Sequence, residues 1–154
     1  MTDVYRSIAN VMVLLQRGDG RVLAVRHGPD SAHSPGLLTV VGGRLEADEF
    51  LDVGAARELF EEVGISANPL QFCQLVHFFT PDGELVIGAA FTTRQWEGEP
   101  YNAEPHKHTE LVWVEPASPP GDCHPFTREV LLNFAARRPY ANIVAPRQGA
   151  GGVQ

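Results

Sequence analysis

The feature that most constrains this chain is an apolar strand that passes through two glycines into a helix rich in carboxylates. Residues 37–41 are apolar and β-branched, and they predict a buried strand that ends at the Gly-Gly pair 42–43. A helix is predicted over 48–63, with Asp48 as its N-cap and Gly64 at the left-handed C-cap position. With further strands before and after it, this unit predicts an α/β fold.

Two faces are expected on this helix. At about 100° per residue, its apolar residues fall within an arc of roughly 120° that we expect to contact the core: Val53, Ala56, Leu59, Phe60 and Val63. Glu58, Glu61 and Glu62 lie on an arc well away from it, with Gly54 among them. Like charges at this spacing repel, so stability alone would favour alternating signs. Hard cations such as Mg²⁺ prefer oxygen ligands. The alternative is a solvated acidic face on an ordinary amphipathic helix.

The residues that flank the carboxylates favour a cation-binding site over a solvated acidic face. Gly43 lets the backbone turn tightly and bring a carbonyl close to a metal. Arg57 precedes the carboxylates, and it can pair across the turn with Glu49. Such a pair would orient the carboxylates around a bound ion.

Residues 43–65 resemble the Nudix box, which is Gly, five residues, Glu, seven residues, then Arg-Glu-aliphatic-x-Glu-Glu-x-Gly-aliphatic. Every specified position is matched, by Gly43, Glu49, Arg57, Glu58, Leu59, Glu61, Glu62, Gly64 and Ile65. One departure is Val41, where the family often has proline before the two glycines. The resemblance implies a Nudix-like α/β/α sandwich with a mixed β-sheet, over about Ser7 to Ala136. It also implies hydrolysis of a diphosphate bond.

The resemblance assigns a role to each matched polar residue. Glu58, Glu61 and Glu62, with the carbonyl of Gly43, are the implied ligands of Mg²⁺ or Mn²⁺. Arg57 and Glu49 become the orienting pair. A bound metal lowers the pKa of water and offsets phosphate charge. Which of Glu61 and Glu62 takes the proton from water is left open.

A second segment, 96–113, is similar to the W-x-G-x-P…N-x-E-P-x-K pattern of the MutT-like branch, which acts on nucleoside triphosphates. The similarity implies that Glu104 is a further metal ligand or base, and that Asn102 and Lys107 contact substrate. Turn chemistry accounts equally well for Asn102. Two nearby histidines, His106 and His108, are expected on the surface.

The rest of the chain predicts one domain over 1–137, followed by a flexible C-terminal tail over 138–154. A second helix is predicted over 127–137, and three phenylalanines are expected in the core: Phe78, Phe79 and Phe91. Further strands are predicted over 8–15, 21–26, 71–80, 85–95 and 111–114.

Charge and composition exclude several classes of protein. The formal net charge is -7 and no run of Lys or Arg occurs, so a polymeric nucleic acid is not expected as a partner. A small nucleotide remains compatible with metal binding. Neither a signal peptide nor a membrane span is expected, which predicts a cytoplasmic protein. The arginine-rich, lysine-poor composition suggests a bacterial source. Monomer and homodimer both stay open.

Three functional hypotheses follow. The leading one is metal-dependent hydrolysis of a nucleoside triphosphate to a nucleoside monophosphate and pyrophosphate. The second is a Nudix hydrolase that acts on ADP-ribose, a sugar nucleotide or another nucleoside diphosphate derivative. The third is a non-catalytic nucleotide-binding domain, which the presence of every box glutamate disfavours.

Overall fold

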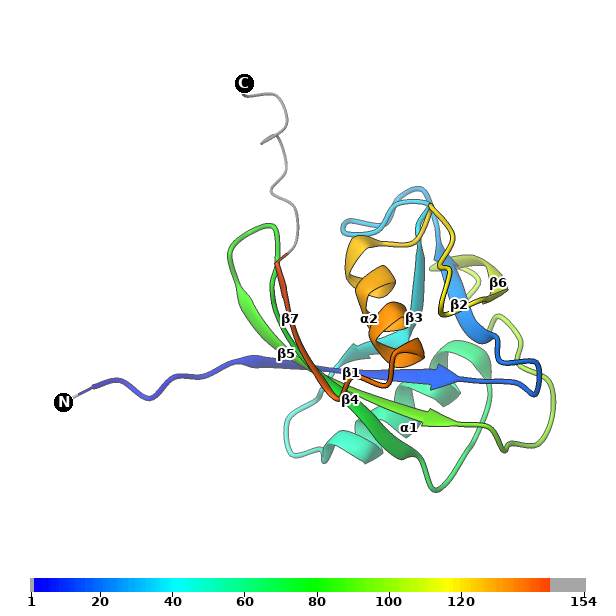
Figure 1. Ribbon diagram of the computed structural model, residues 1–154, viewed down its shortest axis with the longest axis horizontal. Helices are drawn as coiled ribbons and strands as arrows, with labels where there is room; N and C mark the ends of the chain where they lie inside the picture. The colour runs from blue at the N-terminus through cyan, green and yellow to red at the C-terminus, as the bar shows by residue number, and fades with distance from the viewer. Residues whose placement is uncertain (1, 145–154) are drawn as a thin grey trace.

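The computed structural model describes residues 2–144, in which a mixed sheet is flanked by two helices (Figure 1). The strands are β1 (Ile8–Leu15), β2 (Val22–His27), β3 (Leu38–Arg44), β4 (Gln71–Phe79), β5 (Leu85–Thr93), β6 (His108–Val114) and β7 (Tyr140–Val144). The helices are α1 (Leu51–Val63) and α2 (Pro125–Ala135). The described strands form one seven-stranded sheet in the order β6-β2-β3-β1-β5-β4-β7. No helix within 2–144 is long and apolar enough to cross a bilayer.

The central strand β1 shows why the predicted mixed sheet forms. It pairs antiparallel with β3 on one side and parallel with β5 on the other. Because successive side chains of a strand point to opposite faces, β1 contributes to two cores. Val11, Val13 and Leu15 pack in the core that contains Leu59 and Val63 of α1. The alternate residues pack in the core that contains part of α2: Met12 and Leu14, with Val130 and Leu131. One helix on each face confirms the predicted α/β/α sandwich.

The predicted N-cap of α1 is wrong. The helix begins at Leu51, and its N-cap is Phe50, whose side chain makes no capping hydrogen bond. Asp48 instead has φ +65°, a left-handed conformation that aspartate tolerates better than most residues. The turn is closed by Glu49, whose Oε1 accepts from the Glu46 N–H at 3.0 Å. At the other end, Gly64 has φ 71° and its N–H donates to the Phe60 carbonyl, as predicted.

The predicted core face of α1 is partly wrong. Leu59 and Val63 are fully buried, but Val53 is 54% exposed and Phe60 is 57% exposed. The sheet contacts a narrower strip that runs through Ala55 and Leu59. Gly54, which was placed among the carboxylates, is buried.

The C-terminal boundary also differs from the prediction. Strand β7 pairs parallel with β4 along its whole length, from Tyr140 opposite Leu75 to Val144 opposite Phe79. Ile143 is 8% exposed and joins the core beneath α2. The sheet therefore continues through residue 144, into the segment that was predicted as a tail, and β7 pairs with an edge of β4 that would otherwise be open. The remainder of the predicted tail, 145–154, lies outside the described residues.

Two smaller differences concern α2 and the phenylalanines. The second helix begins at Pro125, two residues before the predicted start, because the His124 side chain caps it by accepting from the Phe126 N–H at 3.1 Å. Phe78 and Phe91 are core residues as predicted, at 8% and 7% exposure, but Phe79 is 44% exposed.

Candidate active site

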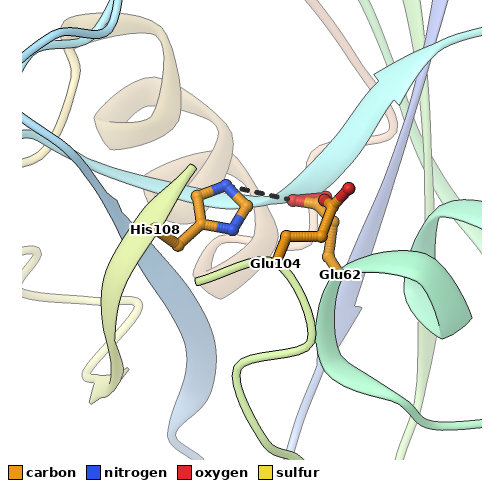
Figure 2. A group of neighbouring side chains, drawn as sticks. All are labelled: Glu62, Glu104 and His108. Carbon is orange, nitrogen blue, oxygen red and sulfur yellow. Dashed lines mark ion pairs between the residues drawn. The ribbon is translucent and has the colours of Figure 1, made fainter. Parts of the chain in front are cut away.

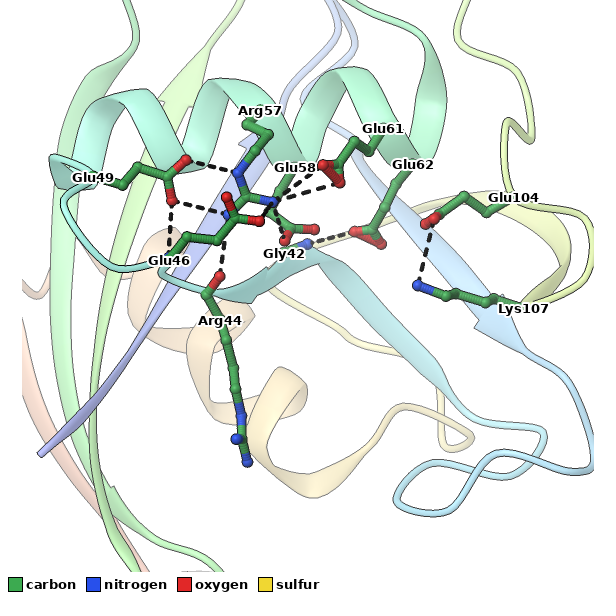
Figure 3. A network of polar contacts seen from close by, with 10 residues as sticks. All are labelled: Gly42, Arg44, Glu46, Glu49, Arg57, Glu58, Glu61, Glu62, Glu104 and Lys107. Carbon is green, nitrogen blue, oxygen red and sulfur yellow. Dashed lines mark hydrogen bonds and ion pairs between the residues drawn. The ribbon is translucent and has the colours of Figure 1, made fainter.

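The C-terminal end of β3 lies beside α1, and carboxylates of α1 contact the backbone of this strand (Figure 3). The Gly42 N–H donates to Glu62 Oε2 at 2.9 Å, and Glu62 is only 4% exposed. At Gly43, an added Cβ would lie 2.5 Å from Glu58 Oε1. Only glycine lets the strand approach the Glu58 carboxylate so closely. Two of the three predicted carboxylates, Glu58 and Glu62, therefore converge on this backbone corner, and the Gly43 carbonyl as a metal ligand stays a prediction.

Arg57 organises the first half of the site, and its pairing with Glu49 agrees with the sequence prediction. Its Nε donates to Glu49 Oε2 at 2.7 Å and its Nη2 donates to Glu49 Oε1 at 2.9 Å, which makes a bidentate pair. The Nη1 group donates to Glu58 at 2.9 Å and to Glu61 at 3.2 Å. Nη2 also donates to the Arg44 carbonyl at 3.1 Å, which ties the helix to the end of β3. One guanidinium thus fixes the carboxylates of three glutamates.

These contacts divide the carboxylates electrostatically. The Arg57 guanidinium lowers the pKa of Glu49 to about 2, so Glu49 is fully ionised at neutral pH. Burial raises the pKa of Glu58, although Arg57 opposes that effect. Burial raises the pKa of Glu62 to about 8, and the neighbouring charges of Glu58 and Glu104 add to the shift. The side chain of Glu61 is the more exposed one, at 45%, and it lies at the rim of these carboxylates.

The loop over 101–108 covers the far end of α1 and brings in the second predicted segment. The Tyr101 N–H donates to the Val63 carbonyl at 3.1 Å, and the Ala103 N–H donates to the Glu62 carbonyl at 3.0 Å. This docking places a carboxylate oxygen of Glu104 within 4.8 Å of ligand atoms on Glu62 and His108. The helical periodicity placed Glu62 away from the apolar arc of the helix. In the structure, this loop and β3 together bury the Glu62 side chain.

Asn102 and Lys107 were predicted to contact substrate, and both lie in this loop. The Asn102 Nδ2 donates to the His108 carbonyl at 2.7 Å, and its Oδ1 accepts from the Glu104 N–H at 3.2 Å. The side chain therefore closes the loop on itself. Lys107 Nζ lies 3.4 Å from Glu104 Oε2, and its side chain is 60% exposed. Of the two residues, Lys107 is exposed and Asn102 is partly buried.

His108 was expected on the surface, and that prediction is wrong. It is 3% exposed, and its Nε2 lies 3.7 Å from Glu62 Oε1 (Figure 2). A tight turn brings it there, because its N–H donates to the Glu104 carbonyl at 3.0 Å. Burial lowers the pKa of His108 to about 4, so the imidazole is neutral at pH 7. The spacing of the two histidines does not predict this turn. His106 is exposed, as expected.

The donor set fits a hard divalent cation. Glu62 is buried and Glu58 partly buried, both carboxyls have raised pKa values, and a positive charge beside such groups favours their ionised form. Glu104 adds a third carboxylate from the loop. Carboxylate and carbonyl oxygens are the ligands that Mg²⁺ and Mn²⁺ take. Residues of the box and of the loop therefore meet at one place where a cation would relieve their mutual repulsion.

The comparison with protein families decides the identity of this arrangement. The model of the NUDIX domain matches residues 6–134. The chain belongs to the Nudix family. It is 28% identical over 124 residues to the uncharacterized Nudix hydrolase YfcD of Escherichia coli K12, a match that covers 80% of this chain and 67% of YfcD. It is 41% identical over 64 residues to the phosphatase NudJ of the same strain, a match that covers 42% of this chain and 40% of NudJ.

Solved structures agree on the fold of this Nudix hydrolase. The MutT Nudix hydrolase of Burkholderia pseudomallei has a TM-score of 0.74 at 24% identity, over 84% of this chain and 98% of that one. The MutT protein of Methanosarcina mazei also has a TM-score of 0.74 at 24% identity, over 87% and 97% of the two chains. Membership makes the chain a hydrolase of pyrophosphate bonds in small nucleotide substrates, in a family that generally requires divalent metal.

Proposed function

We propose that this Nudix hydrolase cleaves nucleoside triphosphates to a nucleoside monophosphate and pyrophosphate. The observation that carries the proposal is the docking of the N-x-E-P-x-K segment, residues 102–107, against the end of α1. That segment resembles the pattern of the branch that acts on nucleoside triphosphates, and it brings Glu104 to the buried Glu62.

The residues of the site have distinct parts in this reaction. Glu58, Glu62 and Glu104, with the carbonyl of Gly43, would hold Mg²⁺ or Mn²⁺. When bound, the cation offsets phosphate charge and makes the attacking water more acidic. Arg57, locked by Glu49, keeps the Glu58 and Glu61 carboxylates in place.

The bond changes balance with water as the only co-reactant. The water oxygen bonds to phosphorus, the bridging P–O bond between the monophosphate and pyrophosphate parts breaks, and the water proton passes to a carboxylate. Of the two carboxylates that do not contact Arg57, Glu104 is the more exposed, at 19% against 6% for Glu62. We assign the proton for this reason to Glu104, at the carboxylate oxygen that would not bind the cation.

A hollow beside Lys107 offers room for the rest of the substrate. It has a volume of about 490 Å³ and is lined by residues 27–31, 105–107 and Thr109. Volumes of roughly 300–1,000 Å³ are usual for small-molecule sites. Lys107 borders both this hollow and Glu104, so its ammonium group can meet a phosphate oxygen between them.

A product assay tests the proposal. The protein is incubated with a panel of nucleoside triphosphates, ADP-ribose and sugar nucleotides, first with Mg²⁺ and then with Mn²⁺. The expected products are pyrophosphate and a nucleoside monophosphate. The variant Glu62→Gln keeps an acceptor for the Gly42 N–H but loses the charge, and we expect its kcat to fall by about a hundredfold or more. Glu129→Gln, on the exposed side of α2, is the matched control.

The other outcomes separate the alternatives. Two monophosphates from ADP-ribose or a sugar nucleotide, without pyrophosphate from any triphosphate, would replace this proposal with the second hypothesis. Release of inorganic phosphate would instead agree with the name of NudJ, a phosphatase. Tight nucleotide binding without turnover would favour the non-catalytic class.

A further inference from the structure

The buried side chain of His108 has no assigned role in the proposed reaction. The side chain is 3% exposed, and its Nδ1 is a buried nitrogen without a hydrogen-bond partner. Its Nε2 points toward Glu62 Oε1 at 3.7 Å, a separation longer than a hydrogen bond (Figure 2). Among the described residues Nε2 has no hydrogen-bond partner, and it is the ring nitrogen that faces the Glu62 carboxylate, so Nε2 is the atom placed to bind a ligand there.

The separation of His108 from the carboxylates suits a shared ion. Two ligand atoms each about 2.1 Å from one cation, at adjacent positions of an octahedron, lie about 3.0 Å apart. The His108–Glu62 distance of 3.7 Å is somewhat longer than that value. Ligand atoms of Glu62, Glu104 and His108 all lie within 4.8 Å of one another, so the three groups need only a small closure to reach a common centre.

The surroundings hold the ring in this orientation. His108 packs edge-on against His27, with ring centroids 4.9 Å apart and an interplanar angle of 89°. His27 is itself fixed by a 2.8 Å contact between its Nε2 and Thr39 Oγ1. The Asn102 amide donates to the His108 carbonyl at 2.7 Å. The imidazole is thus preorganised from β2, β3 and the loop.

We infer that His108 is a metal ligand, which binds through Nε2 a cation that Glu62 and Glu104 also coordinate. The inference deepens the proposed function, on which it rests, because it concerns the same cation site. Imidazole favours first-row transition ions, whereas Mg²⁺ prefers oxygen. His108 therefore shifts the preference of the site toward Mn²⁺ and Co²⁺ over Mg²⁺.

The test uses Mn²⁺ alone, without nucleotide. Pulsed electron paramagnetic resonance of the Mn²⁺ complex of the full chain is expected to show modulation from a directly bonded ¹⁴N nucleus. Labelling the protein with ¹⁵N-histidine must change that modulation, and this measurement needs no variant. In His108→Gln the nitrogen signal is expected to disappear. In His106→Gln, which removes an exposed histidine two residues away, it is expected to remain.

Binding constants give a second readout. We expect His108→Gln to weaken Co²⁺ and Mn²⁺ binding by about tenfold or more, with a smaller change for Mg²⁺. Mn²⁺ bound without any nitrogen coupling in the wild type would overturn the inference and leave the proposed hydrolysis standing. Equal weakening of all three ions in a folded His108→Gln would also overturn it, because that result describes a purely structural histidine. Pyrophosphate production, measured separately, decides the proposed function.

Discussion

At the scale of single residues, the site contains two carboxylates in opposite electrostatic environments, one in the turn before α1 and one in its last turn. Glu49 is held ionised by a bidentate guanidinium, whereas Glu62 is buried with only a backbone N–H as donor. The first arrangement needs no further charge. In the second arrangement, burial opposes the ionisation of the Glu62 carboxyl, and a bound cation would favour that ionisation. Arg57 therefore holds the neighbouring carboxylates in position, and Glu62 is the residue placed to bind a cation.

The Glu49–Arg57 pair predicts how stability depends on pH. Its folded-state pKa of about 2 lies below the ordinary value of 4.5, so the pair's contribution is present above about pH 4.5 and is lost as pH falls toward 2. We expect Glu49→Gln to be destabilised at pH 7 and to approach wild-type stability near pH 2.5. Denaturant unfolding at both pH values measures this.

The matched control for that experiment is Glu46→Gln. Glu46 lies 3.7 Å from the same guanidinium, but its side chain is 65% exposed. Exposed ion pairs contribute little to stability. An effect of Glu46→Gln equal to that of Glu49→Gln would contradict the special role given to the bidentate pair.

At the scale of elements, α1 shows that a helical wheel locates a face only approximately. The box positions fixed the register of the helix, but the sheet contacts a strip centred on Leu59 rather than the whole apolar arc. Phe60 projects into solvent, and Glu62 enters the interior because the 101–108 loop and β3 cover it. Periodicity reports which residues could be buried, and the packing partner decides which are.

Neighbouring substitutions on α1 test this difference. Leu59 is fully buried, so Leu59→Ala should lower the free energy of unfolding by about 2–5 kcal/mol. Phe60 is 57% exposed, so Phe60→Ala should change it by no more than about 0.5 kcal/mol. Chemical denaturation of both variants measures the two values. Similar losses for the two substitutions would restore the wider core face predicted from the sequence.

At the scale of the whole molecule, the sheet joins segments that are distant in the sequence. Strand β7 is the edge strand beside β4, and β6 is the edge strand beside β2. The parallel pairing of β4 with β7 covers an edge and buries Ile143 beneath α2. The sheet therefore includes residues from the segment that the sequence predicted as a flexible tail.

Truncation measures the weight of β7. A chain that ends after Arg138 lacks the strand, and a chain that ends after Val144 keeps it. We expect the shorter chain to be less stable than the longer one by at least about 2 kcal/mol, the contribution of burying one side chain such as Ile143. Thermal and denaturant unfolding of the two chains provide the comparison. Equal stabilities would return the domain boundary to residue 137.

The sequence by itself determined the family, the α/β/α architecture and the Arg57–Glu49 pair. Their signals are local: a box within 23 residues, apolar runs of strand length, and a spacing that places two side chains across one turn. Only the tertiary structure decided that Glu62 is buried and that His108 faces the carboxylates. These facts depend on how the loop over 101–108, which is distant in sequence from α1, docks on that helix, and such long-range contacts leave no periodic pattern in the sequence.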